Sequence, residues 1–163
     1  MQASKPLFTL LATAGALLIS ACSKPASEES VSTTVAEVPA VPVAMPRTAS
    51  PEGASVFFIS PGDGETVSNP IRVEFGIAQM SVVKAGEMAA NAGHHHLLID
   101  TELPDPGMPV PSDEHHRHFG DASTATELTL GSGQHTLQLL FADHLHIPHD
   151  PVVASETITI TVE

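Results

Sequence analysis

The sequence predicts an all-β domain, because hydrophobic and polar residues alternate and turn residues recur between the alternating segments. In residues 71–77, Ile, Val, Phe and Ile alternate with Arg, Glu and Gly, and in residues 157–162 threonine alternates with isoleucine and valine. This period of two gives a strand one apolar and one polar face. Pro-Gly-Asp-Gly at 61–64 and Gly-Ser-Gly at 131–133 are turn sequences that separate such segments.

Short strand-like segments fill residues 55–163 and indicate a sandwich of two sheets. About seven antiparallel strands of this length predict an immunoglobulin-like antiparallel β-sandwich, although the Cys, Trp, Cys signature of antibody domains is missing. The connections 79–93 and 101–114 exceed hairpin length and are candidates for functional loops. The predicted strands are Ser55–Ile59, Ile71–Ile77, His94–Asp100, Thr124–Leu130, His135–Phe141 and Glu156–Val162.

The first 21 residues have the layout of a signal peptide. Lys5 precedes a mostly apolar stretch, 7–21, that is shorter than the roughly 20 residues of a spanning helix, so a transmembrane segment is the less favoured alternative. The sequence Leu-Ile-Ser-Ala-Cys at 18–22 resembles the lipobox of bacterial lipoprotein precursors. That resemblance implies cleavage before Cys22, lipidation of Cys22 and anchoring in the lipid bilayer of the cell envelope. The absence of Asp after Cys22 resembles sorting to the outer membrane, facing the periplasm.

Residues 22–54 are rich in proline, serine and alanine and lack any hydrophobic period. Proline at this density favours extended segments, so we expect a disordered or semi-rigid tether, with a strand within 31–43 as the alternative. The predicted organisation is therefore a signal peptide at 1–21, a tether at 22–54 and a β-sandwich at 55–163.

Net charge narrows the classes of partner. The chain has 6 Lys and Arg against 19 Asp and Glu, a formal charge of −13, and no basic cluster. Such a surface has nothing to neutralise phosphates, so nucleic acid is not an expected partner. Cations are the natural ligands of an acidic surface that also carries ten histidines.

Histidine carries most of the functional information. All ten histidines lie between residues 94 and 149, and six of them form three His-x-His pairs. Residues i and i+2 of a strand share a face about 6.6 Å apart, which lets two imidazoles converge on one ion. With strands running alternately up and down, all three pairs reach one end of the sandwich. The predicted metal ligands are His94, His96, His116, His118, His144 and His146.

The other four histidines have simpler interpretations. His135 falls near the opposite end and is predicted not to be a ligand. His95 points to the opposite face from its neighbours and is expected to be a hydrogen-bonded core residue, while His115 is expected to face solvent. For His149 a rigid loop role and a ligand role remain open. The competing hypothesis is that the paired histidines form a hydrogen-bond network with nearby carboxylates. If the pairs bind metal, the same carboxylates would instead orient the ligands from outside the metal shell. These carboxylates belong to Asp100, Asp113, Glu114 and Asp143.

Ligand chemistry favours copper. The domain has no thiolate, which excludes iron-sulfur clusters and cysteine-type zinc sites. Imidazoles suit copper, zinc, nickel or iron, and copper(II) heads the affinity order. Met80, Met88 and Met108 lie in the flanking loops, where loop packing is favoured over a soft-ligand role. Enzymatic motifs such as Gly-x-Ser-x-Gly and His-Glu-x-x-His are missing, so no catalytic residue is assigned.

Four histidine-bearing segments resemble a known family. The segments at 93–100, 113–120, 133–139 and 143–149 together are similar to the bacterial domain-of-unknown-function family 4399, over roughly residues 57–162. The resemblance implies a small secreted or lipid-anchored domain. His-Arg-His-Phe-Gly-Asp at 116–121 is similar to the first copper-ligand strand of copper-zinc superoxide dismutases, which would make His116 and His118 copper ligands, but the disulfide cysteines of that family are missing.

These observations predict a periplasm-facing lipoprotein that binds copper, or zinc or another transition metal, for capture, storage or delivery. The alternatives are an envelope binding or structural module with an unknown protein partner, a pH sensor, and, least favoured, a dismutase-like enzyme. The pH-sensing hypothesis assumes that all ten histidines gain charge near pH ~6.5 and offset most of the net negative charge.

Overall fold

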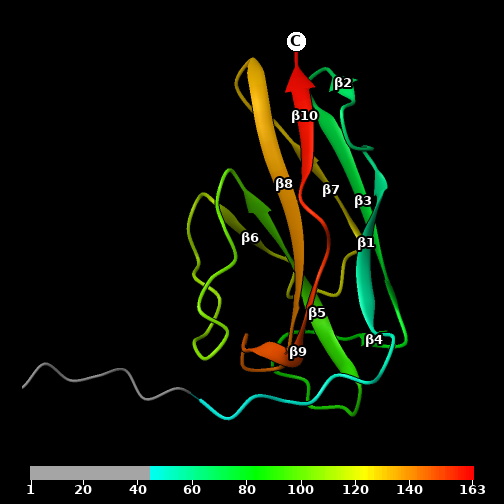
Figure 1. Cartoon of the computed structure of the whole chain (residues 1–163), viewed down its shortest axis with the longest axis vertical. Coiled ribbons are helices and arrows are strands. Elements are labelled where there is room, and N and C mark those ends of the chain that lie inside the picture. Colours follow the sequence, from blue (N-terminus) through cyan, green and yellow to red (C-terminus); the bar gives the residue numbers. More distant parts are fainter. Residues whose placement is uncertain (1–44) are drawn as a thin grey trace, which may run out of the picture. The chain divides into compact units, whose positions relative to one another are not determined.

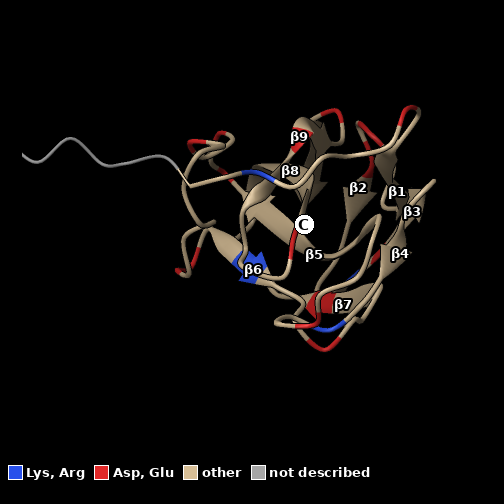
Figure 2. Cartoon of the chain, turned by 90° about the horizontal axis from the view of Figure 1, so that it is seen from below, with Lys and Arg blue, Asp and Glu red and all other residues tan. Residues whose placement is uncertain are grey.

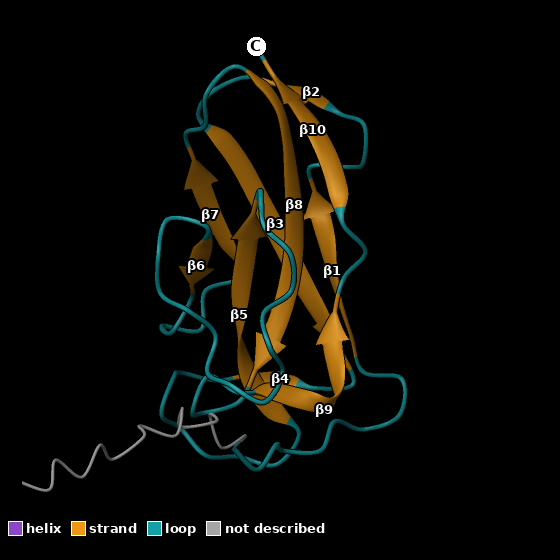
Figure 3. Ribbon diagram, turned by 60° about the vertical axis from the view of Figure 1, so that its left-hand side comes forward, coloured by secondary structure: helices purple, strands orange, loops and turns teal. Residues whose placement is uncertain are grey.

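The computed structural model of the chain describes residues 45–163, which form two β-sheets and no helix (Figures 1 and 3). The all-β prediction is confirmed. The predicted signal peptide, Cys22 and most of the predicted tether lie outside the described residues. Within residues 45–163, no helix is long and apolar enough to cross a membrane.

The smaller sheet contains β1 (Ser55–Ser60), β3 (Ile71–Ala78) and β7 (Ala125–Leu128), in the order β1-β3-β7. Both pairings are antiparallel. The apolar residues of β3 that alternate in the sequence are buried, and Ile71, Val73 and Phe75 are each at most 2% exposed. The period-two pattern therefore identifies the inner face of this sheet correctly.

The larger sheet has the order β2-β10-β8-β5-β4, with β6 paired to β5 and β9 paired to β8. All six predicted strands are present, and the structure adds three short ones, β2, β4 and β6, and the seven-residue β9. Two of these make parallel pairs of two residues each, β2 with β10 and β4 with β5, so the predicted wholly antiparallel arrangement is wrong at these positions. The chain crosses from β3 in the small sheet to β4 in the large sheet and does not turn back in a hairpin, which produces the second parallel pair. The immunoglobulin-like topology is not confirmed. The strands are β2 (Thr66–Val67), β4 (Ser81–Val82), β5 (Ala92–Ile99), β6 (His116–His118), β8 (Gly133–Ala142), β9 (Pro148–Ala154) and β10 (Ile158–Val162).

The main hydrophobic core lies between the two sheets. Phe75, Leu97, Leu139, Phe141 and Ile160 are each at most 1% exposed within it. Full burial of such a side chain contributes about 1.5–3 kcal/mol to the free energy of unfolding. This core supplies a rigid base for β5 and β8, the two longest partners in the large sheet.

β5 is buried on both faces. Leu97 and Ile99 face the main core, whereas Leu98 belongs to a second apolar cluster on the outer face with Val110, Leu140 and Ala142. The connection 100–115 supplies Val110, so it covers this outer face. Because His94 and His96 alternate in phase with Leu98, they lie on the covered outer face of the sheet.

Residues 45–54, the last ten residues of the predicted tether, lie against the domain. The Ser50 amide donates to the Asp150 carbonyl at 3.0 Å, and the Met45 amide donates to the Gly107 carbonyl at 2.9 Å. In Figure 1 this segment, in cyan, runs along the same end of the domain as β4 and β9. The described structure therefore includes ten residues before residue 55, the predicted start of the domain.

Candidate metal centre

Four imidazole rings meet on the outer face of the large sheet. His94 and His96 come from β5, His118 comes from β6, and His146 comes from the turn between β8 and β9. Every pair of these rings has centroids between 4.8 and 5.8 Å apart. Residues far apart in the sequence thus form one cluster, which we call the four-His cluster.

Two pairs of nitrogen atoms in the cluster have the spacing that a shared ion requires. His94 Nε2 lies 3.1 Å from His96 Nε2, and His118 Nε2 lies 3.2 Å from His146 Nε2. The ligand nitrogens of His94, His96 and His118 all lie within 4.8 Å of one another, and these three residues can hold a metal ion. Two nitrogens each about 2.0 Å from a tetrahedral ion are about 3.3 Å apart, close to both short distances.

Strand pairing explains why three of these rings converge. His94 and His96 are separated by two residues on a strand and share its outer face. His96 is the register partner of His118 across the antiparallel β5–β6 pair, which places His118 on the same face. Gly120 leaves room for the ring, since a Cβ at this position would contact both Cε1 and Nε2 of His118.

A tight turn supplies His146. The Asp143 carboxylate Oδ1 accepts hydrogen bonds from the amides of Leu145 at 2.8 Å and Ile147 at 3.0 Å. The His146 amide donates to the Asp143 carbonyl at 2.9 Å. His146 itself has φ of 66°, a left-handed conformation that non-glycine residues rarely adopt. The turn therefore ends the period-two pattern and brings His146 to the cluster.

Burial favours the neutral form of three cluster rings, those of His94, His96 and His118. Burial, followed by repulsion from His146 and His118, lowers the pKa of His94 to about 4. Burial, followed by repulsion from His94, lowers the pKa of His96 to about 2. The pKa of His118 is also lowered, first by burial and then by His146. At pH 7 these imidazoles are unprotonated, which is the form that binds metals.

No carboxylate of residues 45–163 forms an ion pair or hydrogen bond with the four rings, so the carboxylate network proposed from the sequence does not hold the cluster together. Asp113 instead contacts His116 Nδ1 at 2.7 Å, and Asp100 contacts His135 Nδ1 at 2.7 Å. In the described part of the chain, the Nδ1 atoms of His94 and His96 are buried without a hydrogen-bond partner. The short nitrogen contacts of the cluster rings are therefore with one another, while Asp143 and Asp121 act on His94 and His118 only through their charge.

Two of the six predicted ligands lie outside the cluster. His116 is the register partner of Leu98, two residues along each strand from the His96–His118 pair. Its Nδ1 contacts the Asp113 carboxylate. His144 precedes the left-handed residue of the turn, and its ring is not among the rings that contact the cluster in the described part of the chain. The likeness to dismutases, which pairs His116 with His118, therefore applies to only one cluster residue.

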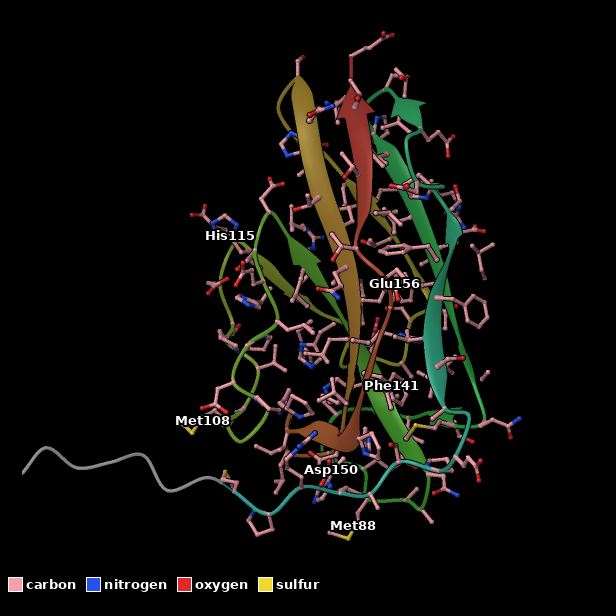
Figure 4. All side chains as sticks on the ribbon, in the orientation of Figure 1. Met88, Met108, His115, Phe141, Asp150 and Glu156 are labelled. Carbon is pink, nitrogen blue, oxygen red and sulfur yellow. The ribbon has the colours of Figure 1, made fainter. Side chains whose placement is uncertain are left out.

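The remaining histidines are held separately. His135 has both ring nitrogens engaged, by Asp100 and by the Gly131 carbonyl at 3.0 Å. His115 contacts the Ile99 carbonyl at 2.9 Å and is exposed at the edge of the molecule (Figure 4). His149 lies in β9 and not in a loop; it is fully buried, stacks on Phe141 and contacts the Thr48 carbonyl at 3.3 Å.

His95 is in the core, as predicted, but without the predicted hydrogen bond. Its ring packs edge-on against Phe75 and Phe141, and both ring nitrogens are buried without a partner in the described part of the chain. Burial lowers its pKa to about 4, and burial also lowers the pKa of His149. Since five histidines have a lowered pKa, the assumption that all ten gain charge near pH ~6.5 is wrong.

One wall of the cluster faces an open groove. His118 lines a hollow of about 690 Å³ with Arg117, Phe119, Gly120 and Asp121. Arg117 is the blue segment of β6 in Figure 2. His94 and His96 are at most 1% exposed, whereas His118 is exposed, so an ion would enter from the side of His118.

The loop methionines lie in two different environments. Met80 packs against the main core, and Met88 is 77% exposed. Figure 4 labels Met88 and Met108, both at the periphery of the molecule. Nothing in the sequence indicates the roles of Thr48 and Gly120. Asp143 was predicted as a carboxylate partner of the histidines, but its side chain accepts the Leu145 and Ile147 amides of the turn instead, as aspartate commonly does in turns.

Comparison with known proteins identifies the family. No curated protein and no solved structure matches the chain. The family described as Domain of unknown function (DUF4399) matches residues 73–163, more than half of the chain and the whole four-His cluster. The chain therefore belongs to the DUF4399 family.

Proposed function

We propose that this domain binds one transition-metal ion, copper in preference to zinc, through His94, His96, His118 and His146. The single observation that carries the proposal is the meeting of four imidazoles: three have ligand nitrogens within 4.8 Å of one another, and His146 Nε2 lies 3.2 Å from His118 Nε2. Copper(II) is the first choice because it heads the affinity order for imidazole sites.

The ligand set favours holding the ion over catalysis. Four imidazoles complete a tetrahedral shell, whereas catalytic sites of this kind keep a position open for water or substrate. Capture, storage or delivery of the ion is the function we propose. Exposure of His118 next to the groove supports exchange of the ion at this ligand.

The location of the domain is part of the proposal. The Leu-Ile-Ser-Ala-Cys sequence supports lipidation of Cys22 and an envelope lipoprotein that faces the periplasm. In that compartment a tethered domain meets incoming metal ions before the cytoplasm does.

A purely structural histidine network has less support. Carboxylate partners are the usual way to satisfy buried imidazoles, and in residues 45–163 they occur at His116 and His135 but not at the cluster. Leaving Nδ1 of His94 and His96 unpartnered costs free energy that a network built for stability would avoid.

Metal titration tests the proposal. We define the reference chain as the full chain carrying Cys22→Ser, so that a cysteine thiol cannot bind metal. After chelator treatment, calorimetric titration with copper(II) and with zinc(II) should show one equivalent bound, with copper tighter. Substoichiometric binding that is lost in modest imidazole would contradict the proposal.

Histidine variants test the ligand set. His94→Ala combined with His118→Ala should abolish uptake with little change in the circular dichroism spectrum. His116→Ala and His144→Ala are matched controls, because the sequence predicts both as ligands and the structure places both outside the cluster; each should keep one equivalent. Melting of the double variant would favour the structural hypothesis.

A further inference from the structure

A short N-terminal segment, residues 45–51, runs along the loop that carries His146; we call it the strap. The Asp150 amide donates to the Thr48 carbonyl at 2.9 Å, and Ala49 forms a parallel bridge with Asp150. Arg47 Nε donates to the Pro148 carbonyl at 3.0 Å, and its Nη1 lies 3.2 Å from the Asp150 carboxylate. The strap thus extends the sheet edge next to β9, where Figure 4 labels Asp150.

One side chain of the strap reaches the turn of the metal centre. The Thr48 hydroxyl donates to Asp143 Oδ2 at 2.7 Å. Asp143 is only 2% exposed, and its other oxygen accepts the Leu145 and Ile147 amides. Both carboxylate oxygens are therefore engaged, one by the strap and the other by the turn.

The turn holds His146 in a conformation that it would not adopt alone. A non-glycine residue at φ of 66° persists only where its surroundings fix it. Two of the fixing bonds involve the backbone of Asp143: its carbonyl accepts the His146 amide, and its amide donates to the Ile147 carbonyl at 3.0 Å. The Val110 amide also donates to the His146 carbonyl, at 2.8 Å. If the Asp143 carboxylate were free to rotate, the Leu145 and Ile147 amides would lose their acceptor.

We propose that Thr48 and Asp143 are positioning residues for His146, so that docking of the strap and binding of metal stabilise each other. This inference rests on the proposed function, because His146 is one of the four proposed ligands. Linkage between the two events is reciprocal: a docked strap raises metal affinity, and bound metal protects the strap by the same factor. The strap therefore influences the metal affinity of the domain although it contributes no ligand.

Thr48→Val in the reference chain tests the positioning role, since valine keeps the shape and removes the hydroxyl donor. Loss of a group that orients a ligand typically weakens metal binding by about 10–100-fold, and we expect a loss in this range. Ser50→Ala is the matched control, because the Ser50 hydroxyl donates to the Pro151 carbonyl on the same strap and does not contact Asp143. Thr48→Ser should restore affinity to within a few-fold of the reference chain.

A double-mutant cycle separates positioning from general weakening. If Thr48 acts through His146, adding Thr48→Val to His146→Ala should cause no further loss of copper affinity. The copper(II) electron paramagnetic resonance spectrum of Thr48→Val should also move towards that of His146→Ala. Additive losses in the cycle, or an equal loss in Ser50→Ala, would overturn the inference.

Amide hydrogen exchange tests the same coupling without a measurement of metal affinity. In the metal-free Thr48→Val protein, the Leu145 and Ile147 amides should exchange faster than in the reference chain. In the reference chain, copper should slow exchange at the Ser50 and Asp150 amides. Unchanged affinity and unchanged exchange in Thr48→Val would overturn the coupling alone, whereas failure of the reference chain to bind metal would overturn the proposed function and the coupling together.

Discussion

Gly120 offers a way to move one proposed ligand without removing it. A Cβ added at Gly120 would lie 2.7 Å from His118 Nε2 and nearer still to Cε1, against about 3.4 Å for the closest ordinary contact. Because Cε1 is the nearer atom, the His118 ring must move by about 1.1 Å to reach an ordinary contact. Since a metal–nitrogen bond is only about 2.0 Å long, such a shift weakens or breaks the bond from this ligand.

Gly120→Ala should weaken copper binding by about 10–100-fold, as loss of ligand positioning does in other metal sites. The backbone at Gly120 does not require a positive φ, so alanine is tolerated there and the fold should remain. Gly131→Ala is the matched control, because a Cβ at that position meets nothing within 4 Å. The assay is competition titration of both variants and the reference chain against a chelator of known affinity. Equal affinity in Gly120→Ala and Gly131→Ala would refute the reasoning.

Three further predictions concern the rest of the domain. His95→Leu should raise the free energy of unfolding by about 1–3 kcal/mol in urea, because it removes a buried imidazole without partners in the described part of the chain, and a loss of stability would contradict this. Leu139→Ala should lower the same quantity by about 2–5 kcal/mol, because Leu139 is fully buried between the sheets, and a loss below about 1 kcal/mol would contradict the described core. Asp100→Asn should lower the melting temperature more at pH 5.5 than at pH 9; equal losses at both values would show that the pairing of Asp100 with His135 does not stabilise the fold.

The sign of that pH dependence follows from two pKa shifts. The hydrogen bond from Asp100 raises the pKa of His135, so the stabilisation is present below the ordinary histidine pKa and is lost as pH rises through the raised value. Burial raises the pKa of Asp100, but hydrogen bonds to His135 and Thr136 outweigh it and leave that pKa lowered. The stabilisation from Asp100 is therefore lost as pH falls through its lowered pKa, and the effect of the pair is largest between the two values.

The sequence predicts the strands that alternate and misses those that are too short to alternate, as well as β9, whose seven residues do not alternate. The apolar residues of β3 and β10 repeat every second position over five to eight residues, which is enough to reveal a strand and its inner face. β2 and β4 have two residues each, and β6 has only His-Arg-His, so none of them shows a period. Their positions depend on which strand lies beside them, and hydrophobic patterning does not encode that.

The part of the candidate metal centre that lies on strands was predictable from the sequence. His94 and His96 share a face by spacing, and alternating strand directions bring His118 to the same end. The choice of His118 over His116 depends on the register of β6 against β5, which the sequence does not reveal. The choice of His146 over His144 depends on a left-handed residue in a turn held by Asp143, where a period-two argument no longer applies.

The role of the N-terminal segment could not be inferred from composition. Prolines at 46 and 51 favour an extended chain, and an extended chain either stays free or adds to a sheet edge. The structure shows the second outcome, because the backbone of residues 48–50 pairs with Asp150. Nothing in the residues before 55 indicates that Thr48 finds its acceptor 95 positions later in the chain.

X-ray absorption of the copper-loaded reference chain shows whether four imidazoles share one ion. We expect one ion per chain with a shell of four imidazole nitrogens about 2.0 Å from the metal, and a shell of three in His146→Ala. A shell dominated by carboxylate or water oxygen, or a nitrogen count that His146→Ala leaves unchanged, would contradict it.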